Sequence, residues 1–200
     1  GVFANANVGT GKTVNITSSY SGADVSNYSV TNQSSTTADI STKALTATAS
    51  ASNKTYDGGT TASTTLILSG FIGSETLTSS TSSSFNNKNV GTGKAVTVNS
   101  ITLADGTNGG LAANYSISAG QTTTANITPK SLTVSGITAS NKIYDGNTVA
   151  TLDSSSVTYS GLVSGDSFAG SYSGLFSDKN IGTGKTVTIS SSYSGSDVNN

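Results

Sequence analysis

The chain has 200 residues, of which only 10% are charged, and its formal net charge is −1. Its nine basic residues are scattered singly, which argues against nucleic acid as a partner, because phosphate binding draws on clustered cations. The sequence has no Cys, Met, Trp or His, so disulfides, thiol catalysis and imidazole metal ligands are excluded.

Several motifs recur at a nearly constant spacing. The pattern Asn-Lys-x-Tyr-Asp-Gly occurs at residues 53–58 and again 88 residues later, at 141–146. The pattern Asn-(Val/Ile)-Gly-Thr-Gly-Lys occurs three times, at 7–12, 89–94 and 180–185. A period of about 87 residues is too long for a solenoid repeat and fits a small domain, so the sequence predicts a tandem array.

The repeat predicts three copies with defined bounds. Residues 1–42 match the C-terminal part of a repeat, 43–129 form a complete repeat, and 130–200 match the N-terminal part of a third, truncated repeat. The last residues, 193–200, correspond to 20–27 of the first copy. We therefore expect these 200 residues to be a segment of a longer chain.

In chain order, the first strand signal is the alternation at 12–20, where Val14, Ile16 and Tyr20 fall on one face. Helix is not expected, because Ser, Thr, Asn, Gly and Val favour strands and turns. In the complete copy we predict strands at 45–50, 64–68, 75–80, 95–103, 115–119 and 122–127. About seven short strands separated by turns predict an all-β fold, in which each repeat is a small antiparallel β-sandwich of the immunoglobulin-like type.

The strand predicted at 95–103 changes phase in its middle. Val96 and Val98 share one parity, whereas Ile101 and Leu103 share the other. One inserted residue accounts for this change, so we predict a β-bulge near residues 99–100 that restores the inward face.

The two Tyr-Asp-Gly triplets favour a structural role. We expect Asp to cap a turn, Gly to take a positive φ, and Tyr to pack its ring while its hydroxyl stays solvated. A catalytic Asp–Tyr pair is the weaker interpretation, because no His completes a triad and a catalytic residue need not recur in every copy. The predicted motif residues are Tyr56, Asp57, Gly58, Tyr144, Asp145 and Gly146.

The Gly-Thr-Gly-Lys segments look at first like the tail of a phosphate-binding loop. The earlier glycine of that motif is absent, since Ala6, Lys88 and Lys179 stand in its place, and a strand rather than a helix is predicted to follow. Tight turns between strands are the better interpretation, and we expect no enzyme. The turn glycines concerned are Gly91, Gly93, Gly182 and Gly184.

Calcium is the one cofactor that the acidic positions leave open. Asp57, Asp145 and Asp105 are candidate ligands, and Asp166 and Asp178 could add further oxygen ligands, although no loop has the dense Asp spacing of a known calcium loop. No other cofactor is expected. An intramolecular Lys–Asn or Lys–Asp crosslink is a further alternative, with solvated lysines at strand edges as the stronger interpretation.

The ordered motifs Asn-Lys-x-Tyr-Asp-Gly, Phe-x-(Asn/Asp)-x-Asn-(Val/Ile)-Gly-Thr-Gly-Lys, Asn-Tyr and Ile-Thr-Pro-Lys resemble the YDG repeat domains over essentially the whole chain. These domains occur in long secreted or surface-attached bacterial proteins, often adhesins of the filamentous-haemagglutinin type. Ala6, which replaces the Lys found at positions 88 and 179, departs from the pattern and argues against an obligatory role for that Lys.

The resemblance implies a structural stalk or filament of a bacterial adhesin or biofilm matrix fibre, at the cell surface or outside the cell. The sparse charge is compatible with self-association, and neighbouring repeats are the expected partners. No stretch approaches the roughly 20 apolar residues that span a bilayer, so no membrane insertion is expected in this segment. The alternative is an adhesive module that binds glycan or a host surface; its candidate aromatic residues are Tyr20, Tyr159, Tyr172 and Tyr193.

Overall fold

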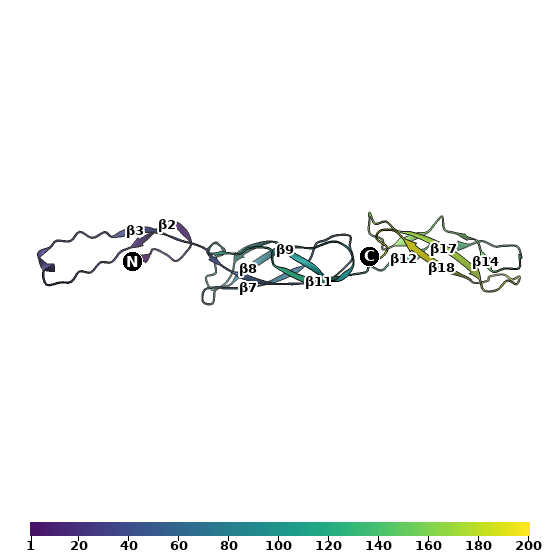
Figure 1. The fold of residues 1–200 in the computed structure, drawn as a ribbon, viewed down its shortest axis with the longest axis horizontal. Coiled ribbons are helices and arrows are strands. Elements are labelled where there is room, and N and C mark those ends of the chain that lie inside the picture. Colours follow the sequence, from purple (N-terminus) through teal and green to yellow (C-terminus); the bar gives the residue numbers. More distant parts are fainter. The chain divides into compact units, whose positions relative to one another are not determined.

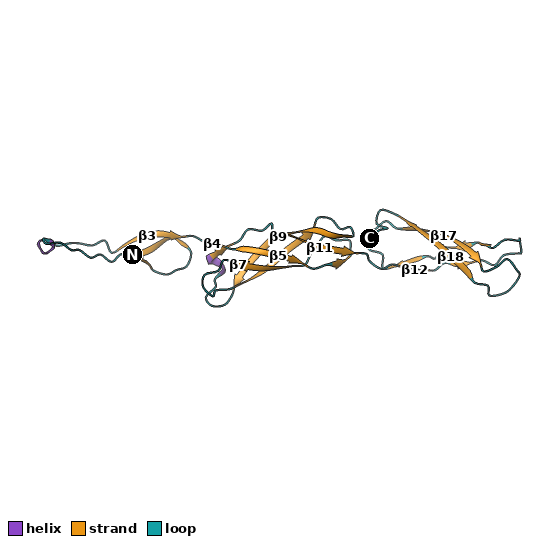
Figure 2. Ribbon diagram, turned by 60° about the horizontal axis from the view of Figure 1, so that its bottom comes forward, coloured by secondary structure: helices purple, strands orange, loops and turns teal.

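The structure, a computed structural model that describes all of residues 1–200, confirms the all-β fold. Its only helical elements are two three-residue 3-10 turns, η1 (Val25–Asn27) and η2 (Ala112–Asn114). Each turn lies directly before the tyrosine of an Asn-Tyr pair. Strands supply all other regular structure (Figure 2). No helix in the chain has the length and apolar character needed to cross a membrane.

The chain divides into two compact units, each made of three segments. Unit 1 comprises Gly1–Ser50, Thr64–Ser83 and Thr97–Thr122. Unit 2 comprises Ala51–Ser63, Ser84–Val96 and Thr123–Asn200. Both units take residues from the middle copy of the sequence repeat. The unit boundaries therefore differ from the predicted repeat boundaries, which remain predictions.

Unit 1 contains an antiparallel sheet with the strand order β1-β2-β3. Its strands are β1 (Val2–Phe3), β2 (Gly9–Asn15) and β3 (Ser35–Ile40). The same unit holds a short parallel pair between β4 (Lys43–Ala44) and β10 (Tyr115–Ser116). The β1-β2-β3 sheet joins residues of the first copy to one another. The β4–β10 pair connects the start of the second copy to a segment near its end.

Unit 2 contains three small antiparallel sheets built from the third copy. The main one has the order β14-β17-β18, with β14 (Val149–Ala150), β17 (Ala169–Phe176) and β18 (Val187–Ser194). Strands β17 and β18 run side by side (Figure 1), paired from Ala169 opposite Ser194 to Phe176 opposite Val187. The remaining pairs are β12 (Thr133–Ser135) with β16 (Thr158–Ser160), and β13 (Thr138–Ala139) with β15 (Leu152–Asp153).

The middle copy supplies two further sheets. One pairs β5 (Thr46–Ala51) with β7 (Thr64–Ser69), and the other has the order β6-β11-β9-β8. The strands of this four-stranded sheet are β6 (Lys54–Thr55), β11 (Thr122–Thr128), β9 (Gly91–Asp105) and β8 (Leu77–Phe85). The expectation of purely antiparallel pairing is wrong for β4–β10 and β6–β11, which are parallel. The long intervening segments supply the crossover that parallel neighbours require.

The strands predicted at 45–50, 64–68, 95–103 and 122–127 correspond to β5, β7, β9 and β11. Strand β8 continues beyond its predicted end at Ser80 through a serine-rich run that resembles a loop. Thr64 of β7 pairs with two hydroxyl groups of this run, since its Oγ1 lies 2.9 Å from Thr81 Oγ1 and 2.7 Å from the buried Ser83 Oγ. The strand predicted at 115–119 shortens to the two residues of β10.

Apolar side chains form a small core in unit 2. Tyr56, Phe85, Val96, Ala125 and Ile127 are all buried and pack as one cluster. Because these residues come from β8, β9, β11 and the loop after β6, the cluster positions the Tyr-Asp-Gly turn against the sheet.

The burial pattern of β9 changes phase at the place where the β-bulge is predicted, and the bulge itself stays a prediction. Val98 is fully buried, Asn99 and Ser100 are both exposed, and Ile101 and Leu103 are again turned partly inward. Two successive exposed residues restore the inward face after the insertion, as a bulge does.

Candidate functional site

The first Tyr-Asp-Gly turn follows β6 and is held by local contacts. Asp57 Oδ1 accepts a hydrogen bond from the Gly59 N–H at 2.9 Å and forms an ion pair with Lys54 Nζ at 2.6 Å. These two contacts, led by the one to Lys54, lower the pKa of Asp57. Gly58 has a φ of 80°, in the left-handed region that favours glycine.

The second Tyr-Asp-Gly turn repeats this geometry. Asp145 Oδ1 accepts from the Asn147 N–H at 3.1 Å and pairs with Lys142 Nζ at 2.7 Å. The pKa of Asp145 is lowered, chiefly by Lys142. Gly146 has a φ of 81°. The two turns are therefore alike in backbone and in their ion pair.

The Gly-Thr-Gly-Lys turn of the second copy is closed by its own lysine. Lys94 Nζ donates to Asn87 Oδ1 at 2.6 Å, and the Gly93 N–H donates to Asn126 Oδ1 at 2.8 Å. Gly93 has a φ of 59°, and a Cβ on Gly91 would lie 3.4 Å from the folded-back side chain of Lys94. The lysine is thus committed to the turn.

The third copy closes its Gly-Thr-Gly-Lys turn in the same way. Lys185 Nζ forms an ion pair with Asp178, which lowers the pKa of that carboxyl group, and donates to the Asn180 carbonyl at 2.8 Å. Gly184 has a φ of 64°, and a Cβ on Gly182 would meet the Lys185 side chain at 3.6 Å.

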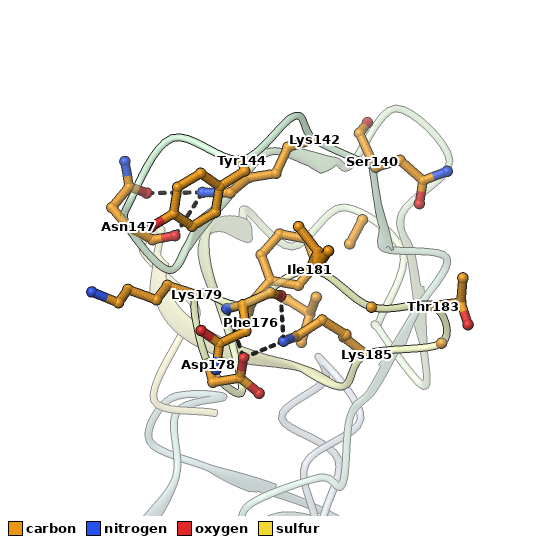
Figure 3. Close-up of a pocket in the computed structure, with 16 residues that line it drawn as sticks. Ser140, Lys142, Tyr144, Asn147, Phe176, Asp178, Lys179, Ile181, Thr183 and Lys185 are labelled. Atoms are coloured by element: carbon orange, nitrogen blue, oxygen red, sulfur yellow. Dashed lines mark hydrogen bonds and ion pairs between the residues drawn. The ribbon is translucent and has the colours of Figure 1, made fainter.

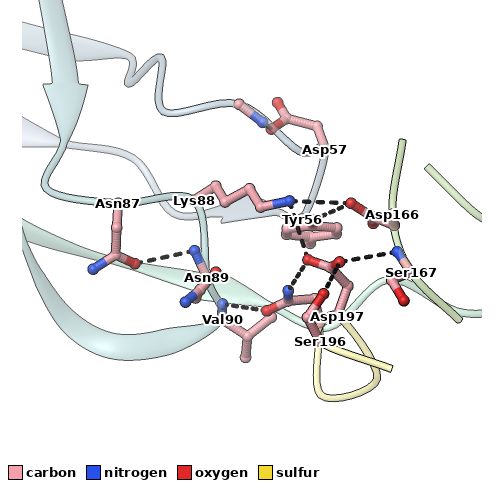
Figure 4. Close-up of polar contacts among 12 residues, drawn as sticks. Tyr56, Asp57, Asn87, Lys88, Asn89, Val90, Asp166, Ser167, Ser196 and Asp197 are labelled. Atoms are coloured by element: carbon pink, nitrogen blue, oxygen red, sulfur yellow. Dashed lines mark hydrogen bonds and ion pairs between the residues drawn. The ribbon is translucent and has the colours of Figure 1, made fainter. Parts of the chain in front are cut away.

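A polar cluster in unit 2 joins the second copy of the repeat to the third (Figure 4). We call it the junction cluster; its members are Tyr56, Lys88, Asp166, Asp197 and Asn200. The Tyr56 hydroxyl donates to Asp166 Oδ1 at 2.8 Å. Lys88 Nζ lies 3.2 Å from Asp166 Oδ1 and 3.0 Å from Asp197 Oδ1. The second copy therefore contributes an aromatic ring and a cation, and the third contributes the carboxylates.

The cluster is well shielded from water on its acidic side. The Asp166 and Asp197 side chains are 6% and 11% exposed, against 38% for Lys88. Lys88 Nζ also lies 5.8 Å from the centroid of the Tyr56 ring, within the range of a cation–π contact. Two carboxylates so little exposed depend on their hydrogen bonds and on the lysine for stability.

The hydrogen bonds shift the pKa values of the cluster in consistent directions. Donation from the Ser167 N–H, the Ser196 hydroxyl and Lys88 lowers the pKa of Asp197 to about 2. Contacts with Tyr56, Asp197 and Asp166 raise the pKa of Lys88. Burial raises the pKa of Tyr56. At neutral pH the lysine is therefore charged, the Asp197 carboxyl is ionised, and the tyrosine keeps its proton.

One contact between copies of the repeat occurs twice. In unit 2 the Val90 N–H donates to Asn200 Oδ1 at 3.1 Å. In unit 1 the Val8 N–H donates to Asn114 Oδ1 at 2.9 Å. Val8 and Val90 are equivalent in the Asn-Val-Gly-Thr-Gly-Lys motif, and Asn200 corresponds to Asn114 through Asn27 of the first copy. An asparagine of each following copy thus binds the same backbone position of the preceding one.

The two motif tyrosines lie in very different surroundings. Tyr56 is 3% exposed, whereas Tyr144 is 58% exposed. The prediction of a solvated tyrosine hydroxyl is wrong for Tyr56, because Asp166 from the next copy binds it. The sequence gives no sign of this difference, since both tyrosines lie in the same motif.

Sequence reasoning missed the acceptors of the junction cluster. Asp166, Asp197 and Asn200 lie in turns of the third copy. The hydrogen bonds from Tyr56 to Asp166 and from Val90 to Asn200 each join residues that are 110 apart in the sequence, and the one from Lys88 to Asp166 joins residues that are 78 apart. A usable signal was present in the recurrence of Asp-Val-x-Asn at 24–27 and 197–200, which local turn chemistry does not require. The replacement of this lysine by Ala6 in the first copy argues against an obligatory role, yet Lys88 pairs with two carboxylates of the third copy.

The predicted calcium ligands do not converge in the structure. Asp57 and Asp145 each pair with a lysine, and Asp105 Oδ1 accepts from the Ala112 N–H at 2.7 Å. No group of three or more acidic residues is placed to hold a metal ion. Calcium binding stays an untested prediction, with no assembled set of ligands to support it.

Three of the tyrosines considered for glycan binding form an aromatic cluster in unit 2, in which Tyr159 and Tyr193 pack against Phe168 and Tyr172 packs against Tyr193. The Tyr159 and Tyr172 hydroxyls lie 2.9 Å apart, and the Phe168 ring centroid is 5.1 Å from that of Tyr159 and 5.2 Å from that of Tyr193. Burial, followed by the contact with Tyr159, raises the pKa of Tyr172 to about 12. Tyr20, in unit 1, is exposed and donates to Asn32 at 2.7 Å.

A cavity lies in the third copy, between its Tyr-Asp-Gly and Gly-Thr-Gly-Lys turns (Figure 3). Its volume is about 560 Å³, and Tyr144, Phe176, Lys179 and Ile181 are among the lining residues. A cavity of only about 70 Å³ remains beside Tyr56, where Asp166, Asp197 and Asn200 also line it. The equivalent surface is therefore open in the third copy and nearly filled in the second.

Glycine-to-alanine changes distinguish the two Tyr-Asp-Gly turns. Both Gly58→Ala and Gly146→Ala place a side chain at positive φ, which costs about 1–2 kcal/mol. Only at Gly58 would the new Cβ approach another group, Val163 Cγ1 at 2.8 Å. We expect Gly58→Ala to cost about 1 kcal/mol more than Gly146→Ala in urea denaturation. Equal losses would contradict close packing of the third copy on this turn.

The pKa of Asp197 predicts a loss of stability in acid. A carboxyl whose pKa is depressed on folding stabilises the fold above its unfolded pKa of about 4, and this contribution disappears as the pH falls from about 4 towards about 2. Urea denaturation between pH 5 and pH 2 measures the slope. We expect Asp197→Asn to reduce the steepness of the decline, whereas an unchanged slope would contradict an ionised Asp197 bound to Lys88.

These turns, strands and inter-copy contacts define an all-β protein whose recurring geometry lies in its glycine turns. The model of the YDG domain family matches residues 41–125 and again residues 128–200. The chain belongs to the YDG domain family. Comparison with curated proteins and with solved structures found no significant match.

Proposed function

We propose that this chain is a non-catalytic structural segment, part of a stalk or filament of a bacterial extracellular adhesin or matrix fibre. The observation that carries the proposal is the contact from Val8 to Asn114 and from Val90 to Asn200, which binds successive copies at equivalent positions. A stalk requires the same junction to recur along the chain. A catalytic or ligand-binding site does not.

Two further features support a load-bearing role. The ring of Tyr56 is buried against the third copy, and Lys88 pairs with two carboxylates of that copy. In the proposal each copy is a small immunoglobulin-like sandwich, and copies follow one another as a tandem array. The sparse charge of the chain is compatible with further association between molecules outside the cell.

Electron microscopy of the intact native chain, with and without a calcium chelator, tests this function. We expect a regular beaded filament whose axial period matches one repeat and does not change on chelation. Flexible single strands would contradict the stalk, and collapse on chelation would show that the junctions depend on metal. A glycan array run in parallel tests the adhesive alternative.

A further inference from the structure

Two parallel strand pairs in the second copy each join a strand near its start to a strand near its end. Strand β4 pairs with β10 in unit 1, and β6 pairs with β11 in unit 2. The chain enters the copy through β4 and leaves it through β11, which ends at Thr128 directly before Pro129. Tension along the chain therefore reaches each pair through both of its strands.

The parallel sense of these pairs decides how tension acts on them. When the ends of the copy are pulled apart, the earlier strand of each pair is drawn towards the N-terminus and the later strand towards the C-terminus. In a parallel pair these directions are opposite along the strand axis, so the strands are sheared and the evenly spaced bonds between them resist together. In an antiparallel hairpin pulled at its open end, the bonds break one after another.

The β6–β11 pair is held by hydrogen bonds from the Asn-Lys-x-Tyr motif. The Tyr56 N–H donates to the Thr128 carbonyl at 2.9 Å, and the Asn126 N–H donates to Asn53 Oδ1 at 2.7 Å. The side chains of Tyr56 and Ile127 beside these bonds are buried. Water therefore has little access to replace the bonds singly, and the motif asparagine binds the last strand of its own copy.

The β4–β10 pair has the same construction. The Leu45 N–H, directly after β4, donates to the Ser116 carbonyl at 2.8 Å, and Leu45 and Tyr115 are both buried. The Tyr115 hydroxyl donates to Glu75 and accepts from the Ile72 N–H at 3.1 Å, which fixes β10 to the loop before β8. Each parallel pair thus has a buried side chain from both of its segments beside its hydrogen bonds.

A further hydrogen bond fixes the last strand to the Gly-Thr-Gly-Lys turn in two copies. The Gly93 N–H donates to Asn126 Oδ1 of β11 at 2.8 Å. In the first copy the Gly11 N–H donates to Asp39 Oδ1 of β3, also at 2.8 Å. Asp39 and Asn126 are equivalent in the repeat. Attachment of the last strand to this turn is therefore a recurring feature of the copies.

We propose that the pairs β4–β10 and β6–β11 form a mechanical clamp, through which the second copy resists tension along the chain. The copy unfolds under tension when the bonds of the clamp break together, and Asn53 is one of the residues that bear this tension. The inference rests on the proposed function and deepens it, because it makes the stalk a segment that transmits force.

Single-molecule force spectroscopy of the whole 200-residue chain tests the clamp by comparing two pulling directions. In one sample the handles are attached to the chain ends. In the other they are attached to Thr78→Cys and Ala104→Cys, at exposed positions near the open end of the β8–β9 hairpin, where Thr76 and Thr107 are in contact. The chain has no other cysteine. We expect the second copy to need about twice the force in the end-to-end pull, since forced unfolding follows the barrier along the pulled direction.

Two substitutions separate the clamp from overall stability. Asn53→Ala removes the acceptor of the Asn126 N–H, and we expect unfolding about five- to thirtyfold faster at constant end-to-end force. The matched control, Thr64→Ala, removes contacts with Thr81 and Ser83 outside both pairs. It should lower stability in urea and leave the rate under force unchanged, because those contacts persist when the clamp breaks. The second copy is the longest of the three, so its unfolding gives the longest extension step.

Equal forces in the two pulling directions would overturn the clamp, as would equal acceleration by Asn53→Ala and Thr64→Ala. The first comparison uses unaltered strand pairs, so it decides the matter even where Asn53→Ala fails to fold. A beaded filament whose second copy unfolds at equal forces would leave the stalk without a clamp. Flexible single strands in electron microscopy, combined with a higher force in the end-to-end pull, would instead remove the stalk and leave the clamp.

Discussion

Replacing Tyr56 with alanine is expected to destabilise the folded chain by about 3–5 kcal/mol, the range for truncating a buried aromatic side chain. The ring is 3% exposed and packs with Phe85 and Ile127, and its hydroxyl binds Asp166. The change opens a cavity in the core of unit 2 and leaves a little-exposed carboxylate without one of its donors. Urea denaturation followed by circular dichroism measures the loss.

The matched control is Tyr144→Ala, which alters the same motif in the third copy. Tyr144 is 58% exposed, so its truncation should change the free energy of unfolding by less than about 0.5 kcal/mol. A similar loss at both tyrosines would mean that the motif acts only within its own turn. That result would contradict a junction in which the third copy covers Tyr56.

The second large effect is expected from Asp166→Ala, which should cost about 2–3 kcal/mol. The side chain is 6% exposed and is the acceptor of the Tyr56 hydroxyl and a partner of Lys88. Removing it leaves the buried Tyr56 hydroxyl without an acceptor and Lys88 with one partner fewer. The expected loss is large because hydrogen bonds to charged groups stabilise a fold more than neutral hydrogen bonds do. Tyr56→Phe alone should cost about 1–2 kcal/mol for the same reason.

A double-mutant cycle isolates the contact between the two residues. If the hydroxyl and the carboxylate interact, the double variant Tyr56→Phe, Asp166→Ala should lose about 1–2 kcal/mol less than the sum of the single losses. Tyr144→Phe, at an exposed tyrosine, should have almost no effect. Strictly additive losses would show that Tyr56 and Asp166 stabilise the chain independently, against the hydrogen bond between them.

Much of the local structure could be predicted from the sequence because its causes are local. The turn at Asp57 depends on an N–H two residues away and on a lysine three residues before it. The phase change in β9 follows from the parity of its own valines and leucine. Alternation and turn chemistry act over a few residues, so one copy of the repeat suffices to recognise them.

The remaining features of the structure could not be predicted, because they depend on which distant segment of the chain covers each surface. Tyr56 and Tyr144 have the same motif, yet only one is buried, because its cover comes from residues 166 and 197–200. Strand β8 extends through a serine run because Thr64, from another strand, satisfies its hydroxyls. Strands β4 and β10, which pair in parallel with each other, are likewise far apart in the sequence. Periodicity carries no information about such long-range pairing.

Backbone amide exchange in a dilute sample tests most directly whether successive copies are bound through equivalent contacts. The Val8 and Val90 N–H groups donate to asparagines of the following copy, whereas the equivalent Ile181 N–H is exposed and has no acceptor. We predict slow exchange at Val8 and Val90 and fast exchange at Ile181, and faster exchange at Val90 alone in Asn200→Ala. Equal, fast exchange at all three positions would contradict the recurring junction on which the proposed stalk depends.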